Sequence, residues 1–478
     1  MLVAMATASI SDWPDALHLN VLQHLGSAQE VWSILWPYSA LCKACQLAVQ
    51  LPSLWSRVDL CGAGDVSASE LKRFLEREHV RKEVCELSLR GLDFGEALPN
   101  IVAGLPSLQT LDLGRCPELS TPGVVVLCDA LARLPLRHLA LDALASLEDE
   151  HVETLCETCL ELRSLDVRFC ERLGQVSCFI RTSARWSSLQ LDGCFRLQVF
   201  QMLEARDITF SALEELSLDG ELLEAHALAL LPHRCPRLRS LAVSFAAELD
   251  GPALAALASL NELEALTLKK AQKPLDNEWS GFFMQQGAHH YSFASWRLLN
   301  FCECELLSDG AALTLAASAL PQLVELDLSW CWNLGDNGLG SLLDAAPGLE
   351  RLRIAGLKNI SAKSLVPCCR MSGLEELDCT ACNSVSDTFL EFLLRLFAAP
   401  PGKGGDALPC EDHLSWCLRG LTAALWRRRR IWAKRPQIKN YYAQLLEDWS
   451  QLKPAVEVIA YAEPLLAEDA AKSCGLVG

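Results

Sequence analysis

The pattern L-x-x-L-x-L recurs along most of this 478-residue chain and restricts its fold more than any other feature. Twelve copies follow one another at intervals of 24 to 28 residues, except for one interval of 33 residues. Each copy predicts a short strand whose alternate side chains enter a core. Because one copy cannot bury its own apolar edge, we expect the copies to stack on one another. Their first positions are Val84, Leu108, Leu136, Leu162, Trp186, Leu213, Leu238, Leu263, Trp296, Leu323, Leu349 and Leu374.

The segments between the copies carry apolar residues at roughly helical spacing, as in residues 253–258 and 338–343. Each unit is therefore predicted to be a strand, a turn and a helix, with the period of a leucine-rich repeat. The predicted fold class is α/β. It is a leucine-rich-repeat solenoid of about twelve repeats over residues 61–397, with a curved parallel sheet inside and helices outside.

Six of the twelve copies carry a cysteine eight residues after their first position. A small side chain with a weak S–H donor fits where the chain leaves the strand and meets backbone groups of the neighbouring coil. Residues 323–331, LVELDLSWC, resemble the cysteine-containing class of leucine-rich repeats. That class is mostly intracellular, so the resemblance implies a reducing compartment, the cytosol or the nucleus. The six are Cys116, Cys170, Cys194, Cys304, Cys331 and Cys382.

A metal site is not predicted, although three C-x-x-C pairs occur at residues 42–45, 156–159 and 379–382. No two of these pairs have the separation that a zinc ribbon needs. In the last pair, Cys379 falls on a core position of a strand and Cys382 belongs to the periodic cysteines. We therefore expect neither a metal nor a cofactor.

The segment before the repeats has a different pattern. Residues 13–25 read as a helix with proline in its first turn and apolar residues on one face. Two further segments, ALCK at 40–43 and LPSLWSRVDL at 51–60, lead directly into the repeats. On these residues, positions 13–60 resemble an F-box.

The resemblance implies a small helical module that docks on the Skp-type adaptor of a cullin ubiquitin ligase, while the repeats hold the protein substrate. The chain would then be a non-catalytic substrate receptor that brings substrate lysines close to a ubiquitin-conjugating enzyme. The alternative is a leucine-rich-repeat interaction scaffold whose N-terminal helices only cap the solenoid. The predicted adaptor-binding residues, some of which would pack inside the module, are Pro14, Leu17, Val21, Leu22, Leu25, Leu41 and Trp55.

Side-chain alternation predicts that the third and fifth positions of each copy, and the position after its last leucine, face the concave surface. Eleven of these positions are acidic and five are basic, an excess of six negative charges. This bias favours a substrate with a basic segment. The alternative is that aspartate before the last leucine simply belongs to the repeat. The predicted substrate-binding residues are Asp112, Asp142, Asp166, Asp192, Glu215, Asp219, Glu325, Asp327, Arg351, Arg353, Glu376 and Asp378.

Charge and motif content exclude several other functions. The formal net charge of −18 makes nucleic acid an unlikely main partner, because binding to phosphates requires clustered cations. No apolar stretch reaches the length of a membrane-spanning helix, so no membrane association is expected. The chain has no G-x-S-x-G, H-E-x-x-H or strand-linked G-x-G-x-x-G motif, so catalysis is not predicted.

The long interval and both ends of the chain leave alternatives open. The 33-residue interval holds Trp279, Phe282 and Phe283, which either pack on the outer helices or belong to a loop that clamps a ligand. Residues 398–412 are predicted to be a linker and 413–478 a helical cap or tail, and residues 1–12 are expected to be disordered. The basic run at 427–435 is a structural end-cap, a nuclear import signal or a nucleic-acid contact.

Overall fold

A computed structural model describes residues 55–61, 66–116, 119–205, 207–221, 223–288, 295–371 and 373–382, and the backbone of 429–434 and 456–461. The chain divides into two compact units, Met1–Leu216 (unit 1) and Ser217–Gly478 (unit 2), and each is described by itself. The predicted linker and the expected disorder at 1–12 lie outside the described residues. So do six of the seven predicted adaptor contacts: Pro14, Leu17, Val21, Leu22, Leu25 and Leu41.

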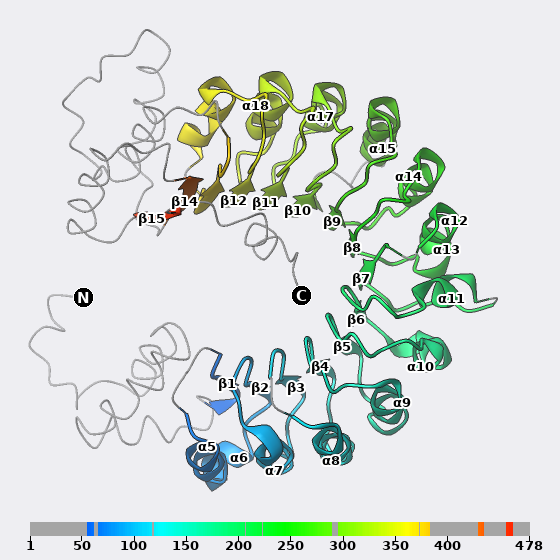
Figure 1. The fold of residues 1–478 in the computed structure, drawn as a ribbon, viewed down its shortest axis with the longest axis vertical. Coiled ribbons are helices and arrows are strands. Elements are labelled where there is room, and N and C mark those ends of the chain that lie inside the picture. The colour runs from blue at the N-terminus through cyan, green and yellow to red at the C-terminus, as the bar shows by residue number, and fades with distance from the viewer. Residues whose placement is uncertain are drawn as a thin grey trace, which may run out of the picture. The chain divides into compact units, whose positions relative to one another are not determined.

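In unit 1 each strand pairs with the next one along the chain, in parallel and in register. All the helices of this unit lie on one side of its strands (Figure 1). The strands are β1 (Arg57–Asp59), β2 (Glu86–Ser88), β3 (Thr110–Asp112), β4 (His138–Ala140), β5 (Ser164–Asp166) and β6 (Ser188–Gln190). The helices are α5 (Ala68–Leu75), α6 (Glu78–Arg81), η3 (Gly95–Ala97), α7 (Leu98–Val102), α8 (Thr121–Leu131), α9 (Asp149–Thr158), α10 (Ser177–Arg181), η4 (Ser183–Arg185) and α11 (Val199–Glu204).

Strand β7 (Glu215–Asp219) begins in unit 1 and ends in unit 2. In unit 2, strands β8 to β13 again pair in parallel with their sequence neighbours. These strands are β8 (Ser240–Ser244), β9 (Ala265–Leu268), β10 (Leu298–Asn300), β11 (Glu325–Asp327), β12 (Arg351–Arg353) and β13 (Glu376–Asp378). The helices are α12 (Ala225–Ala229), α13 (Leu231–Arg234), α14 (Gly251–Leu257), α15 (Asp276–Ala288), α17 (Asp309–Ala316), α18 (Asp336–Ala345) and η5 (Ala362–Arg370).

The predicted fold is confirmed, since β2 to β13 each begin two residues after the first position of one predicted copy. Leucines of the pattern fill the core. In β3, for example, Leu111 is buried while the flanking Thr110 and Asp112 are half-buried on the opposite side. Each described unit is therefore a stretch of leucine-rich-repeat solenoid, an open parallel sheet with helices on one side. No helix within the described ranges is long and apolar enough to cross a membrane.

A further coil precedes the twelve that the sequence predicts. Strand β1 pairs in parallel with β2, and Trp55, Val58 and Leu60 are buried at the spacing W-x-x-V-x-L. The Trp55 ring lies edge-on to Phe74 of α5, with 4.8 Å between ring centroids. Residues 55–60, which the sequence assigned to the N-terminal module, therefore form the first coil of the sheet. Trp55 is one of the residues that pack inside the chain.

The six periodic cysteines link neighbouring coils, as the sequence predicts. Each thiol donates to the backbone carbonyl of the sixth position in the preceding copy, for example Cys331 to Phe301 at 3.0 Å. Burial raises the pKa of Cys170 and Cys304 to about 12, so these two thiols remain protonated donors. The other bonds join Cys116 to Leu89, Cys170 to Leu141, Cys194 to Val167, Cys304 to Leu268 and Cys382 to Ile354, at 3.0 to 3.5 Å.

Carboxylates join the helix starts of successive coils. The Asp309 carboxylate accepts from the backbone N–H of Gly335 at 2.7 Å. The Asp336 carboxylate accepts from both the backbone N–H and the hydroxyl of Ser361, at 2.5 and 2.6 Å. Each of these acids lies in the first turn of its own helix and satisfies donors at the start of the next one. Stacking of the coils is therefore polar as well as apolar.

The long interval contains α15, and its aromatic residues face the core. Trp279, Phe282 and Phe283 are each at most 2% exposed. The ring centroids of Trp279 and Phe301 in the next coil are 5.3 Å apart. These residues therefore pack among the helices and strands and are not available to clamp a ligand.

The C-terminal region contains strands at positions where the sequence predicted helix. Strand β14 (Arg429–Lys434) pairs in parallel with β13, and β15 (Val456–Tyr461) pairs with β14. The helical prediction for 413–478 is thus wrong at these residues, and the remainder of that region lies outside the described part. The β-branched and aromatic residues of these two segments favour extended backbone.

Candidate functional site

The candidate site is the side of the sheet opposite the helices, which we call the strand face. It consists of the third, fifth and seventh positions of each coil, because the first, fourth and sixth are buried. All twelve predicted substrate-binding residues belong to this face, and the structure shows that many of them contact one another.

Aspartates at the fifth position hold the chain where it turns away from the strand. The Asp327 carboxylate accepts from the backbone N–H of Ser329 at 3.0 Å. Asp112, Asp166 and Asp378 make the same bond to the residue two positions later, at 2.9 to 3.1 Å. This turn satisfies a backbone donor, which gives these acids a structural role. Part of the acidic bias of the face therefore belongs to the repeat itself.

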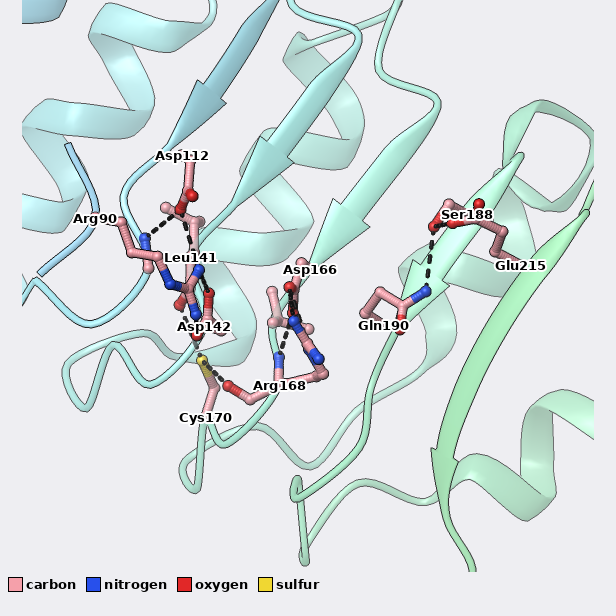
Figure 2. Close-up of polar contacts among 12 residues, drawn as sticks. Arg90, Asp112, Leu141, Asp142, Asp166, Arg168, Cys170, Ser188, Gln190 and Glu215 are labelled. Atoms are coloured by element: carbon pink, nitrogen blue, oxygen red, sulfur yellow. Dashed lines mark hydrogen bonds and ion pairs between the residues drawn. The ribbon is translucent and has the colours of Figure 1, made fainter. Parts of the chain in front are cut away.

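In unit 1, ion pairs neutralise much of the strand face (Figure 2). Arg90 reaches across one coil and donates to both carboxylate oxygens of Asp142, at 2.7 and 2.5 Å, and its Nη1 lies 3.3 Å from Asp112. Only 3% of the Asp142 side chain is exposed. Arg168 pairs with Asp166 at 2.7 Å. Two arginines of the chain thus occupy the place that a basic partner would take on β3 to β5.

Strands β6 and β7 carry polar groups of another kind. The Ser188 hydroxyl donates to the Glu215 carboxylate at 2.9 Å, and the Gln190 amide donates to Ser188 at 3.3 Å (Figure 2). Glu215 is exposed, and Gln190 and Asp192 are half-buried. This end of unit 1 offers carboxylate and amide groups to an external donor.

In unit 2, the charges of β11 to β13 form a second paired group. Arg351 and Arg353 both donate to Glu325 at 2.7 Å, and Arg353 also donates to Glu376 at 3.1 Å. Burial raises the pKa of Asp327, against the opposing effect of its bonds to Ser329. These side chains stabilise one another across three strands.

The predicted residues therefore differ in how accessible they are. Asp142, Asp219 and Asp327 are buried, at most 7% exposed, so they are poor candidates for direct substrate contact. Arg351 and Arg353 keep 40% and 33% of their side chains exposed. Glu215 is the most open of the acids predicted in unit 1.

Aromatic residues at the edge of the strand face were not predicted. Phe169 and Phe195 of unit 1 are 37% and 43% exposed, and Trp332 of unit 2 is 38% exposed. They lie seven or nine residues after the first position of a coil, where the chain leaves the strand. The sequence signal that could have revealed them is an aromatic residue at a turn position where the repeat does not require one.

Within the described ranges, no group of three or more His, Cys, Asp or Glu side chains could hold a metal ion. The periodic thiols donate to backbone carbonyls, and most of the strand-face acids accept from arginines or from turn N–H groups, whereas Glu215 accepts from Ser188 and is exposed. The groups available on this face can donate, accept and pack, which suits the binding of a protein segment.

Comparisons with known proteins agree with this fold. The Leucine Rich repeat family profile matches residues 104–128 and 320–343. A search of curated proteins finds no match. A chain in the crystal structure of the Rad7 and Elc1 complex in yeast superposes with a TM-score of 0.53 and 17% identity, covering 78% of this chain and 90% of that one.

An internalin from Listeria monocytogenes superposes with a TM-score of 0.36 and 13% identity, over 72% of this chain and 95% of that one. The matched repeats, the register of the strands and the yeast structure lead to one conclusion about architecture. The described chain has the leucine-rich-repeat fold.

Proposed function

We propose that this chain is the substrate-recognition subunit of a cullin-type ubiquitin ligase. Its repeats bind a protein substrate through the strand face, and residues 13–54 bind the Skp-type adaptor. The chain itself breaks and forms no bonds. It raises the local concentration of substrate lysines near a charged ubiquitin-conjugating enzyme.

The strand face is the observation that supports the proposed binding of a substrate. Its side chains project from in-register strands, so a partner can lie across several coils. The face is polar and has exposed aromatic residues at its edge, a composition typical of protein interfaces.

The adaptor-binding half rests on the resemblance of residues 13–60 to an F-box. We restrict the proposed adaptor-binding segment to residues 13–54, because residues 55–60 form the first coil. The solved yeast neighbour is a complex of two proteins, Rad7 and Elc1, which is consistent with a chain of this fold that works in an assembly.

The scaffold alternative keeps a specific observation in its favour. Trp55 packs on Phe74 and seals the first coil. If residues 13–54 continue that seal, their apolar side chains are consumed inside the chain, and no adaptor binds.

The test is affinity purification of the full chain with a purified Skp-type adaptor. We expect stoichiometric recovery with the wild type and loss of recovery with Leu17→Asp plus Leu22→Asp. The matched control is Leu313→Asp on α17, where the side chain is 45% exposed and far in sequence from the module. It should bind the adaptor like the wild type.

Thermal unfolding of the same variants separates the two functions. In a receptor, the double variant loses the adaptor while the melting temperature of the repeats is unchanged. In a capped scaffold, the wild type recovers no adaptor and the double variant lowers the melting temperature, because two charges replace buried leucines.

A further inference from the structure

Two buried cysteines of unit 1 stand outside the periodic set. Cys156 lies in α9 and Cys178 in α10, and they are 2% and 4% exposed. The periodic thiols of this unit donate to backbone carbonyls. The Cys178 thiol instead donates a hydrogen bond to the Cys156 sulfur, from one coil to its neighbour. Unit 1 therefore holds two thiols in direct contact that the proposed function does not use.

A cation lies beside this pair. Arg185, the last residue of η4, donates from its Nη2 to the backbone carbonyl of Cys156 at 2.9 Å and also interacts with the Cys156 sulfur. Its guanidinium carbon lies 4.8 Å from the centroid of the Trp186 ring, a contact that helps to hold the group in place. Among the residues that the structure describes, the buried Nε of Arg185 has no hydrogen-bond acceptor. The guanidinium therefore keeps an unused donor close to a sulfur that can become negative.

These contacts favour ionisation of one thiol over the other. The hydrogen bond from Cys178 lowers the pKa of Cys156, and the charge of Arg185 acts in the same direction, against the effect of burial. Donation of that bond, together with burial, raises the pKa of Cys178. The thiolate is the nucleophilic form of cysteine. The pair thus combines a sulfur that can attack an oxidant with a neutral thiol in contact with it.

The other cysteine of the C-x-x-C motif, Cys159, is a less suitable partner for Cys156. Its sulfur lies 3.9 Å from the Thr158 hydroxyl, and burial raises its pKa. Within the described residues, the Cys156 sulfur is hydrogen-bonded to Cys178 and not to Cys159. The contacts therefore favour a bond between coils over a bond within the motif.

We propose that Cys156 and Cys178 are a redox-active pair that a peroxide converts into a disulfide between the coils of β4 and β5. The Cys156 thiolate attacks the peroxide, the O–O bond breaks, and the leaving oxygen takes the proton that Cys156 had released. The Cys178 thiol then displaces water from the resulting sulfenic acid and forms the S–S bond. The two thiols lose two electrons, which the peroxide gains. A dithiol reductant reverses the reaction by thiol–disulfide exchange.

Local opening of α10 gives a small oxidant access to the buried pair. This helix has five residues and no side-chain hydrogen bond at its N-cap, whereas α8 and α9 have 11 and 10 residues. A short helix without a cap opens at a low cost in free energy. A disulfide restricts the open state, because it ties α10 to α9. The redox state of the pair should therefore set how often this coil opens.

The experiment treats the full-length protein with a small excess of hydrogen peroxide, alkylates the remaining thiols in denaturant and maps disulfides by mass spectrometry of unreduced peptides. We expect a disulfide between Cys156 and Cys178, with loss of two hydrogen atoms, that dithiothreitol reverses. Cys170, a buried periodic thiol of the same coil as Cys178, is the internal control and should stay reduced. Hydrogen exchange in α9 and α10 should be about tenfold slower, or more, in the oxidised protein.

Matched variants test the role of each group. Cys178→Ser should prevent the disulfide and leave Cys156 as a sulfenic acid, which dimedone traps. Cys156→Ser should leave Cys178 reduced. Arg185→Gln should slow disulfide formation roughly three- to tenfold, because the cation that favours the thiolate is lost. Arg172→Gln removes an exposed arginine of the same coil and should leave the rate unchanged.

Mapping of the wild type keeps the proposal testable even if a variant does not fold. The proposal is overturned if Cys170 is oxidised as fast as the pair, or if Cys156 forms its disulfide with Cys159. It is also overturned if no disulfide forms, if oxidation speeds hydrogen exchange in α9 and α10, or if Arg185→Gln reacts as fast as Arg172→Gln. Adaptor recovery bears on none of these outcomes, since the pair lies within the repeats.

Discussion

The Arg90–Asp142 pair allows the energetic role of the strand-face network to be tested. We consider Arg90→Met, which keeps most of the side-chain volume and removes the charge. Asp142, with 3% of its side chain exposed, then loses two hydrogen bonds of 2.7 and 2.5 Å and its counter-charge. Removing one partner of a fully buried pair costs about 3–5 kcal/mol, because the other charge is left without compensation.

The expected cost here is lower. Because 27% of the Arg90 side chain is exposed to water, the solvent screens part of the interaction. We therefore predict a loss of roughly 2–3 kcal/mol, confined to the coils of β2 to β4. Repeat proteins do not always unfold in one step, so a global melting curve is a poor measure of such a local effect. Hydrogen exchange followed by mass spectrometry resolves it coil by coil.

At 1.36 kcal/mol per tenfold change, amides in these coils should exchange roughly 30- to 150-fold faster than in the wild type. Peptides from β11 to β13 should be unchanged. The variant Arg90→Met plus Asp142→Asn should recover most of the protection, because no isolated charge remains. Arg172→Met, which breaks an exposed pair with Glu148, should change exchange less than threefold. Equal exchange in Arg90→Met and Arg172→Met would refute the reasoning.

Three further predictions concern stability and reactivity. Burial raises the pKa of Cys170 to about 12, so iodoacetamide at pH 8 should modify the exposed Cys61 in the folded chain and reach Cys170 only after denaturation, as peptide mapping would show. Burial also raises the pKa of Asp327, so ionisation of this carboxyl opposes folding as the pH rises above its pKa in the unfolded chain. Asp327→Asn should therefore be at least as stable as the wild type at pH 7. In thermal melts below pH 4, the variant should lose that advantage. Asp336 is partly buried, which raises its pKa, but hydrogen bonds from Ser361 lower the pKa below its ordinary value of 3.8. Asp336→Ala should therefore lower the free energy of unfolding by roughly 1–2 kcal/mol at pH 7. In thermal melts below the folded-state pKa of Asp336, this difference should vanish.

The sequence predicted the repeat architecture closely, for a physical reason. Each coil must bury leucines at fixed positions of a short strand, so the period and the register are visible without a structure. The same reasoning predicted the bonds from cysteine to the neighbouring coil. It missed the coil that begins at Trp55, because residues 55–60 have the spacing of the repeats but were assigned to the segment that resembles an F-box.

The strand face was harder to predict, because its chemistry depends on contacts between coils. Composition gave the sign of the charge but not that Arg90 reaches Asp142 two coils away, 52 residues along the chain. Nor could it separate aspartates that cap a turn, such as Asp327, from acids that remain open, such as Glu215. Phe169 and Phe195 were overlooked because the repeat does not require an aromatic residue in the turn where they lie.

The most direct test of the central claim is hydrogen exchange of the full chain, alone and with a purified Skp-type adaptor. The account predicts that the adaptor protects amides within residues 13–54 and leaves the coils from β1 to β13 unchanged. Protection on the strand face, or no protection anywhere, would contradict a receptor whose adaptor contact and substrate surface occupy different parts of the chain.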